Sequence, residues 1–95
     1  MNLIIKVKEI KGHCPVFSRG DKFMLEDGYK LVSDIPVCMH ALSSIMPFYN
    51  ALRVSDPAKF GIAGKDNADA GFVQCPDVCD YTKGGTAILE ISREE

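Results

Sequence analysis

Alternating apolar residues at the two ends of this 95-residue chain constrain its fold more than any other feature. The alternating positions are Leu3, Ile5 and Val7 at the start and Ala87, Leu89 and Ile91 at the end. A period of two is typical of strands that bury one face. We therefore expect strands over residues 2–11 and 86–92, each a natural partner of the other. Because Ile10 breaks the alternation, a β-bulge is expected near Lys8-Glu9.

The clearest helical pattern in the sequence follows Asp34. Its apolar positions recur every three or four residues, at Ile35, Cys38, Leu42, Ile45, Tyr49 and Leu52. This stripe predicts an amphipathic helix that starts near Asp34 and ends near Arg53, with Leu42 and Ile45 in the core. Ser33 or Asp34 is expected to cap the free N–H groups at its start. Pro36 is compatible with this start, because proline is tolerated in the first turn of a helix. Pro47 predicts a kink near Met46, or two shorter helices in succession.

The remaining segments are shorter and less regular. Residues 22–25 and 29–32 are expected to be extended, with a turn over 26–28. Residues 54–74 contain several glycines and no clear period, so we expect an irregular loop in which function or mobility could reside. The whole pattern predicts one α+β domain over residues 1–95. Its core would be a small antiparallel sheet that includes both terminal strands, with one Pro-kinked helix packed on it.

Composition and charge exclude several classes of partner. The net charge is −2 and the charged residues of both signs are interspersed, so no basic stripe indicates a nucleic-acid partner. No apolar run is long enough to cross a bilayer, so no membrane association is expected. The first residues lack the pattern of a secretory signal, which predicts a cytoplasmic protein. Composition and charge are compatible with an unknown protein partner and with a homo-oligomer.

The four cysteines are the residues with the most distinctive chemistry. They are Cys14, Cys38, Cys75 and Cys79. In a reducing cytosol, cysteines serve more often as thiols or metal ligands than as disulfides. The spacing of Cys75 and Cys79 falls within the range of zinc-ligand pairs, and iron–sulfur clusters also use thiolates from separate loops. We therefore predict a cysteine-ligated metal-binding module that holds zinc or an iron–sulfur cluster.

Two other functions remain open at this point. Cys75 and Cys79 could cycle between dithiol and disulfide, as in a thiol redox protein. Alternatively, the cysteines could pack as small apolar residues in a metal-free interaction module, and Cys38 lies on the apolar stripe where such packing is expected. His13 and His40 are the only histidines, and each is more typical of an exposed polar residue than of a ligand or general base. No catalytic residue is predicted, and an enzyme is the less favoured class.

Several short motifs resemble those of an uncharacterised bacterial and archaeal family of small cysteine-containing proteins. The motifs are Gly12-x-Cys14-Pro15, Gly20-Asp21-x-Phe23, Cys38 at a helix start, Ser44-Ile45-x-Pro47, Ala51-Leu52, Cys75-Pro76-Asp77 and Ile88-Leu89-Glu90-Ile91. A cysteine at the position of Cys79 is less typical of that pattern. The resemblance therefore implies a three-cysteine site, with water, histidine or a carboxylate as a fourth ligand, and it implies no activity.

Overall fold

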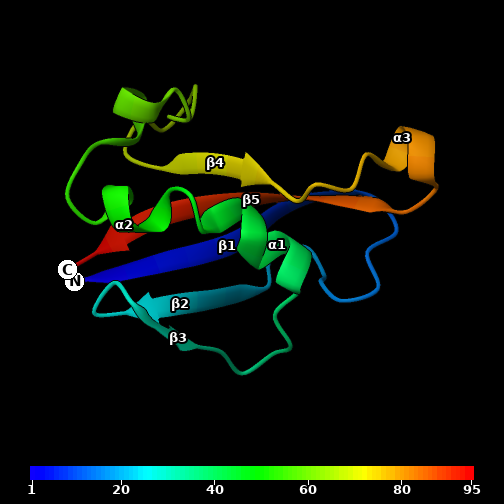
Figure 1. Cartoon of the computed structure of the whole chain (residues 1–95), viewed down its shortest axis with the longest axis horizontal. Helices are drawn as coiled ribbons and strands as arrows, with labels where there is room; N and C mark the ends of the chain where they lie inside the picture. The colour runs from blue at the N-terminus through cyan, green and yellow to red at the C-terminus, as the bar shows by residue number, and fades with distance from the viewer.

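The two terminal strands form the centre of the sheet in the computed structural model, which describes residues 1–95. β1 (Asn2–Gly12) and β5 (Gly85–Glu94) pair antiparallel in a ladder that includes Ile5 opposite Ile91. Their alternating apolar side chains point to one face and are almost completely buried. The ends of the chain lie side by side at one end of this pair (Figure 1). The alternation in the sequence therefore predicted this pairing correctly.

Three shorter strands complete a five-stranded sheet in the order β3-β2-β1-β5-β4. They are β2 (Lys22–Glu26), β3 (Lys30–Val32) and β4 (Gly71–Gln74). Every neighbouring pair is antiparallel. The predicted α+β class, with both terminal strands in one antiparallel sheet, is confirmed.

A β-bulge interrupts β1 at Lys8. The register with β5 shifts between Val7 and Glu9, so an extra residue is accommodated there. After the bulge Ile10 pairs with Ala87 and packs against the core. Without the shift, Ile10 would point to the other face, because a one-residue slip reverses every side chain. The expected bulge is confirmed.

The helical segment is two short helices, and it begins later than predicted. α1 spans Met39–Ile45 and α2 spans Tyr49–Leu52, with Pro47 between them. The start predicted near Asp34 is wrong. The Ser33 hydroxyl accepts a bond from the Ile35 N–H and donates one to the Ile35 carbonyl, which favours a local turn over a helical one. The N-cap is Cys38, whose side chain makes no capping bond.

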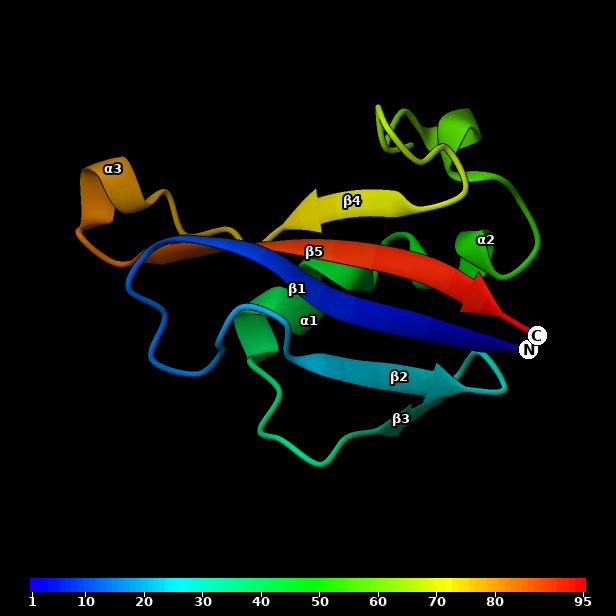
Figure 2. The same ribbon diagram turned by 180° about the vertical axis from the view of Figure 1, so that it is seen from behind.

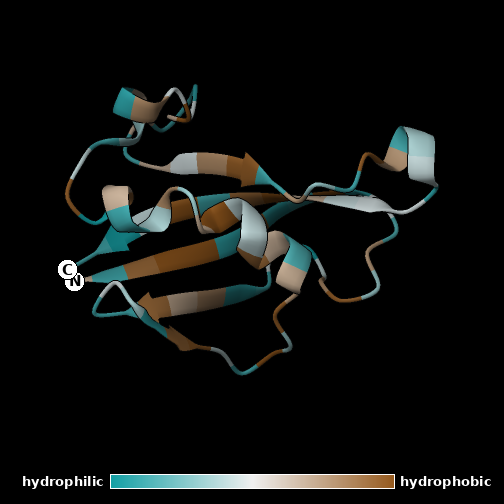
Figure 3. Ribbon diagram, viewed as in Figure 1, coloured by the Kyte–Doolittle hydropathy of each residue, from teal (hydrophilic) through white to brown (hydrophobic).

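The helices cover one face of the sheet and bury a stripe shifted from the predicted one (Figure 1). Ala41, Ile45 and Leu52 are buried, whereas Leu42 is only half-buried and lies outside the core cluster. The placement of Leu42 in the core was therefore wrong, and that of Ile45 is confirmed. Brown apolar segments of β1 and β5 lie directly beneath these helices (Figure 3).

The segment predicted as an irregular loop contains ordered structure. A 3₁₀ turn spans Pro57–Phe60, and the chain then returns to form the edge strand β4. β4 and β5 are joined by a loop that carries one helical turn, α3 (Cys79–Thr82). α3 projects from the end of the sheet that is distant from the chain termini (Figure 1).

No helix covers the second face of the sheet, where β1 and β5 lie in full view from behind (Figure 2). This uncovered face carries mixed side chains, such as Ile4, Lys6 and Glu90. No helix of the molecule combines the length and the hydrophobicity that are needed to span a lipid bilayer.

Candidate functional site

Cys75 is the most deeply buried of the four cysteines. It directly follows β4, is 7% exposed and belongs to the core cluster on the covered face. Its N–H donates to the Ala87 carbonyl, and its Sγ accepts the Ala87 N–H at 3.2 Å. The Sγ also lies 3.7 Å from the Gly85 carbonyl oxygen, to which it donates. β5 therefore fixes both the backbone and the sulfur of Cys75.

Cys14 lies in the loop that follows β1, beside the same core. It is half-buried and packs against the core cluster. Its Sγ accepts a hydrogen bond from the Phe17 N–H at 3.3 Å, which closes a tight turn. The ring of Phe17 is buried and stacks on Phe23, with ring centroids 6.1 Å apart. The buried phenylalanine thus anchors the turn that holds the sulfur.

Gly85 brings the segments of Cys14 and Cys75 together. A Cβ on Gly85 would lie 2.3 Å from the His13 oxygen and 2.7 Å from the Cys14 nitrogen, so only glycine permits this approach. The Gly85 carbonyl is the group that accepts from the Cys75 sulfur. One residue of β5 therefore contacts the Cys14 loop on one side and Cys75 on the other.

Cys38 approaches the core from the helical layer. It is the N-cap of α1, is half-buried and packs against the same core cluster as Cys14. Its sulfur makes no capping hydrogen bond. Three cysteines from distant parts of the chain therefore lie in or against one core, on the covered face of the sheet.

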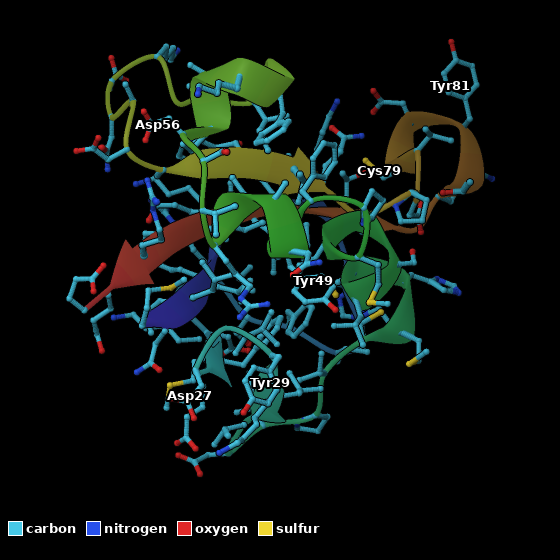
Figure 4. All side chains as sticks on the ribbon, turned by 60° about the vertical axis from the view of Figure 1, so that its left-hand side comes forward. Asp27, Tyr29, Tyr49, Asp56, Cys79 and Tyr81 are labelled. Carbon is cyan, nitrogen blue, oxygen red and sulfur yellow. The ribbon has the colours of Figure 1, made fainter.

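Cys79 lies apart from those three. It begins α3 and lines a depression of about 310 Å³ together with Glu9, Gln74 and Ile88, which extend from the uncovered face. Its N–H donates to the Thr86 hydroxyl at 3.4 Å. Figure 4 shows Cys79 beside the turn, with Tyr81 pointing outward from it. Cys79 is absent from the core cluster that includes Cys75.

An ion pair dominates the electrostatics around Cys79. Lys11 Nζ donates to Asp80 at 2.8 Å, and both side chains are mostly exposed. This hydrogen bond, together with the negative charge of Asp80, raises the pKa of Lys11 above its usual 10.5. The ion pair links the α3 turn to the end of β1.

The four thiols are free, and no disulfide joins any of them. No group of three or more histidine, cysteine, aspartate or glutamate side chains is already arranged to hold a metal ion. His13 and His40 are both exposed, as predicted for ordinary polar residues. The predicted four-sulfur set is thus divided into three residues near one core and Cys79 elsewhere.

A second group of residues on the uncovered face was not predicted from the sequence; it combines the charged Lys8 and Glu90 with the aromatic Phe72. The bulge at Lys8 was a usable signal, since bulges often redirect side chains at functional sites. Phe72 and Glu90 come together only through the pairing of β4 with β5.

The resemblance to the small cysteine-containing family stays a prediction. Comparisons with protein families, curated proteins and solved structures give no significant match.

Proposed function

We propose that the chain is a small cysteine-ligated metal-binding module, with Cys14, Cys38 and Cys75 as ligands for zinc or an iron–sulfur cluster. The observation that carries this proposal is the common location of the three residues. They come from the loop after β1, the start of α1 and the end of β4, yet all lie in or against one core. Cys79 is assigned no part in the site, because it lies beside the uncovered face.

Hydrogen bonding to two of the sulfurs supports the proposal. Backbone N–H groups donate to the sulfurs of Cys14 and Cys75. Such bonds orient a sulfur and are among the interactions that adjust the properties of thiolate-bound clusters. Soft thiolate ligands favour zinc and iron–sulfur clusters over hard cations such as magnesium or calcium.

Ligation requires a local movement, since no three ligands already stand in position. Cys75 is fixed by β5 and Cys14 is held in its turn by the Phe17 N–H, whereas Cys38 makes no capping bond at the end of the irregular segment before α1. Cys38 is therefore the least constrained of the three, and ligation would bring it toward the other two. Since ligation links strand, helix and loop, binding should stabilise the fold.

The direct test is metal analysis with a visible absorption spectrum, on protein purified without oxygen. We expect bound zinc without visible absorption, or iron with the absorption of a cluster. Cys75→Ser should lose the metal, whereas the matched variant Cys79→Ser should retain it. A metal-free wild type whose thermal midpoint is unchanged by chelator would overturn the proposal.

A metal-free interaction module is the second candidate, and the environment of Cys75 favours it. This thiol is already buried and satisfied by hydrogen bonds, as a packing cysteine would be. An exposed apolar pair on the projecting turn, Val78 and Tyr81, is available for a protein contact.

A redox pair of Cys75 and Cys79 is the third candidate, and it requires two thiols from different environments to meet. If Cys75→Ser and Cys79→Ser each abolish reversible disulfide formation to the same extent, the redox candidate would be supported.

A further inference from the structure

A depression of about 360 Å³ opens on the uncovered face, away from the cysteine-bearing core. Its lining includes Lys8, Gly64, Lys65, Asp66, Phe72 and Glu90. They come from β1, β4 and β5 of the sheet and from the loop that precedes β4. Its volume falls in the range of small-molecule sites, which is about 300–1,000 Å³.

The loop is held tightly against the sheet by Gly64. A Cβ on Gly64 would lie 2.5 Å from the Phe72 ring and 2.6 Å from the Asn67 carbonyl oxygen, so a side chain does not fit. The Gly64 N–H donates to the Ala70 carbonyl at 2.9 Å, and the Phe72 N–H donates to Ile62 at 2.8 Å. The depression is therefore a formed feature with an aromatic wall, rather than a gap beside a loose loop.

Charges of both signs surround this aromatic wall. Glu90 lies directly opposite Phe72 in the β4–β5 ladder, and its side chain is only 19% exposed. Its one ion pair is a loose contact with Lys8 Nζ at 4.0 Å, which leaves most of the acceptor capacity of the carboxylate free. The loop supplies a second cation, Lys65, which forms no ion pair.

We propose that this depression binds a small zwitterion that carries an aromatic group, such as a free aromatic amino acid. Glu90 would accept its ammonium group, Lys65 and Lys8 its carboxylate, and Phe72 would contact its ring. A partly desolvated carboxylate with free acceptor capacity favours an ammonium group, since a charge-assisted hydrogen bond forms between them. Two lysines and two carboxylates, Glu90 and Asp66, line the depression. A purely anionic ligand would meet the carboxylates unfavourably, and a purely cationic one would meet the two lysines.

The test is a titration of the isotope-labelled full chain, followed by the backbone amide signals in nuclear magnetic resonance spectra. Three probes are compared: L-phenylalanine, 3-phenylpropionate without the ammonium group, and phenethylamine without the carboxylate. We expect phenylalanine to shift the signals of Gly64, Asn67 and Phe72 in a saturable manner, with at least about tenfold weaker binding of the other two. Phenylpropionate or phenethylamine binding as tightly as phenylalanine would overturn the proposal, as would no shift with any probe.

Two matched pairs of variants locate the binding. Glu90→Gln should weaken phenylalanine binding by about tenfold or more. Glu26→Gln, which alters another lysine-paired carboxylate of the sheet outside the depression, should leave it unchanged. Lys65→Ala should likewise weaken binding relative to Lys59→Ala. Unchanged amide signals elsewhere in the spectrum confirm that each variant is folded, and equal affinities within a pair would overturn the assignment. These residues are separate from the cysteines, so failure here would not bear on the proposed metal site.

Discussion

The sulfur of Cys75 accepts a hydrogen bond from the backbone N–H of Ala87 at 3.2 Å, inside the pairing between the end of β4 and β5. This contact joins the cysteine loop to the strand that carries the centre of the core. Since the thiol also donates to the Gly85 carbonyl, Cys75 stabilises the fold whether or not it binds an ion. The effect of a substitution at Cys75 on stability therefore has two components, the loss of these contacts and the loss of a metal ligand.

Replacing Cys75 with alanine in the presence of chelator should measure the structural component. The change removes a buried sulfur and leaves the Ala87 N–H without its sulfur partner, so we expect a loss of about 1–3 kcal/mol in the free energy of unfolding. Cys79→Ala should cost less than about 0.5 kcal/mol, because Cys79 lies outside the core. Urea denaturation of the three proteins gives the comparison. Equal losses would show that the core contacts of Cys75 are unimportant.

Gly85→Ala should disturb the approach of the Cys14 loop to β5. The new Cβ would meet the backbone of His13 and Cys14, which lacks the freedom of a side chain to move aside. We expect destabilisation of about 1–3 kcal/mol, as for overpacking in a core. Gly71→Ala is the control, since Gly71 is also a buried strand glycine but its nearest neighbour is the flexible end of Ile62 at 3.2 Å. A control as damaging as Gly85→Ala would contradict the steric argument.

Ile45→Ala should be far more costly than Leu42→Ala. Ile45 is 1% exposed within the core, so its truncation should cost about 2–5 kcal/mol. Leu42, half-buried and outside the core cluster, should cost clearly less. Denaturation midpoints of the two variants, compared at a common slope of unfolding free energy against denaturant concentration, measure the two losses. Equally large losses at both positions would restore the stripe that the sequence predicted, in which both residues lie in the core.

The error at Leu42 shows where sequence patterns fail. A period of two places side chains on one of two faces, so both terminal strands were predicted correctly with their bulge. A helical stripe is broader, and a rotation of less than one position exchanges Leu42 for Ala41 while Ile45 and Leu52 stay buried. The start near Asp34 failed because Ser33 bonds locally to Ile35. Each local competition of this kind involves about 1 kcal/mol, the net value of one hydrogen bond, which a sequence pattern does not resolve.

Two four-residue elements, β4 and α3, and the position of Cys79 were beyond sequence reasoning for a different reason. Neither element is long enough for a period to be recognised. Tertiary contacts form both, through the pairing of β4 with β5 and the bond from Cys79 N–H to Thr86. The spacing of Cys75 and Cys79 is compatible with one shared ion, yet the backbone between them leads to different faces. Linear spacing alone does not encode that separation.

The ion pair of Lys11 with Asp80 should contribute a pH-dependent component to stability. The pKa of Lys11 is raised in the folded chain, so the contribution is fully present below the unfolded value of 10.5 and is lost as pH rises through the higher folded value. We expect thermal midpoints of wild type and Lys11→Met to differ by a constant small amount from neutral pH up to that region and to converge above it. Added salt should reduce the same difference at neutral pH, since both groups are exposed. A difference that persists at high pH would indicate lost packing of the lysine stem instead.

Chelator sensitivity should separate the metal ligands from the packing cysteines. Binding to the folded state alone raises stability by about 2.7 kcal/mol when the free ion is at a hundred times its dissociation constant. The thermal midpoint of wild type should therefore fall on addition of chelator, and that of Cys79→Ser should fall equally. Cys14→Ser and Cys38→Ser should start lower and respond no further, because each removes a ligand. Thiols must lose their protons to bind, so readdition of zinc to the stripped wild type in weak buffer should also release protons.

Packing alone predicts losses of stability that follow burial, with the largest loss at Cys75 and no response to chelator in any variant. A redox pair predicts instead that Cys75→Ser and Cys79→Ser behave alike and that Cys14→Ser hardly matters.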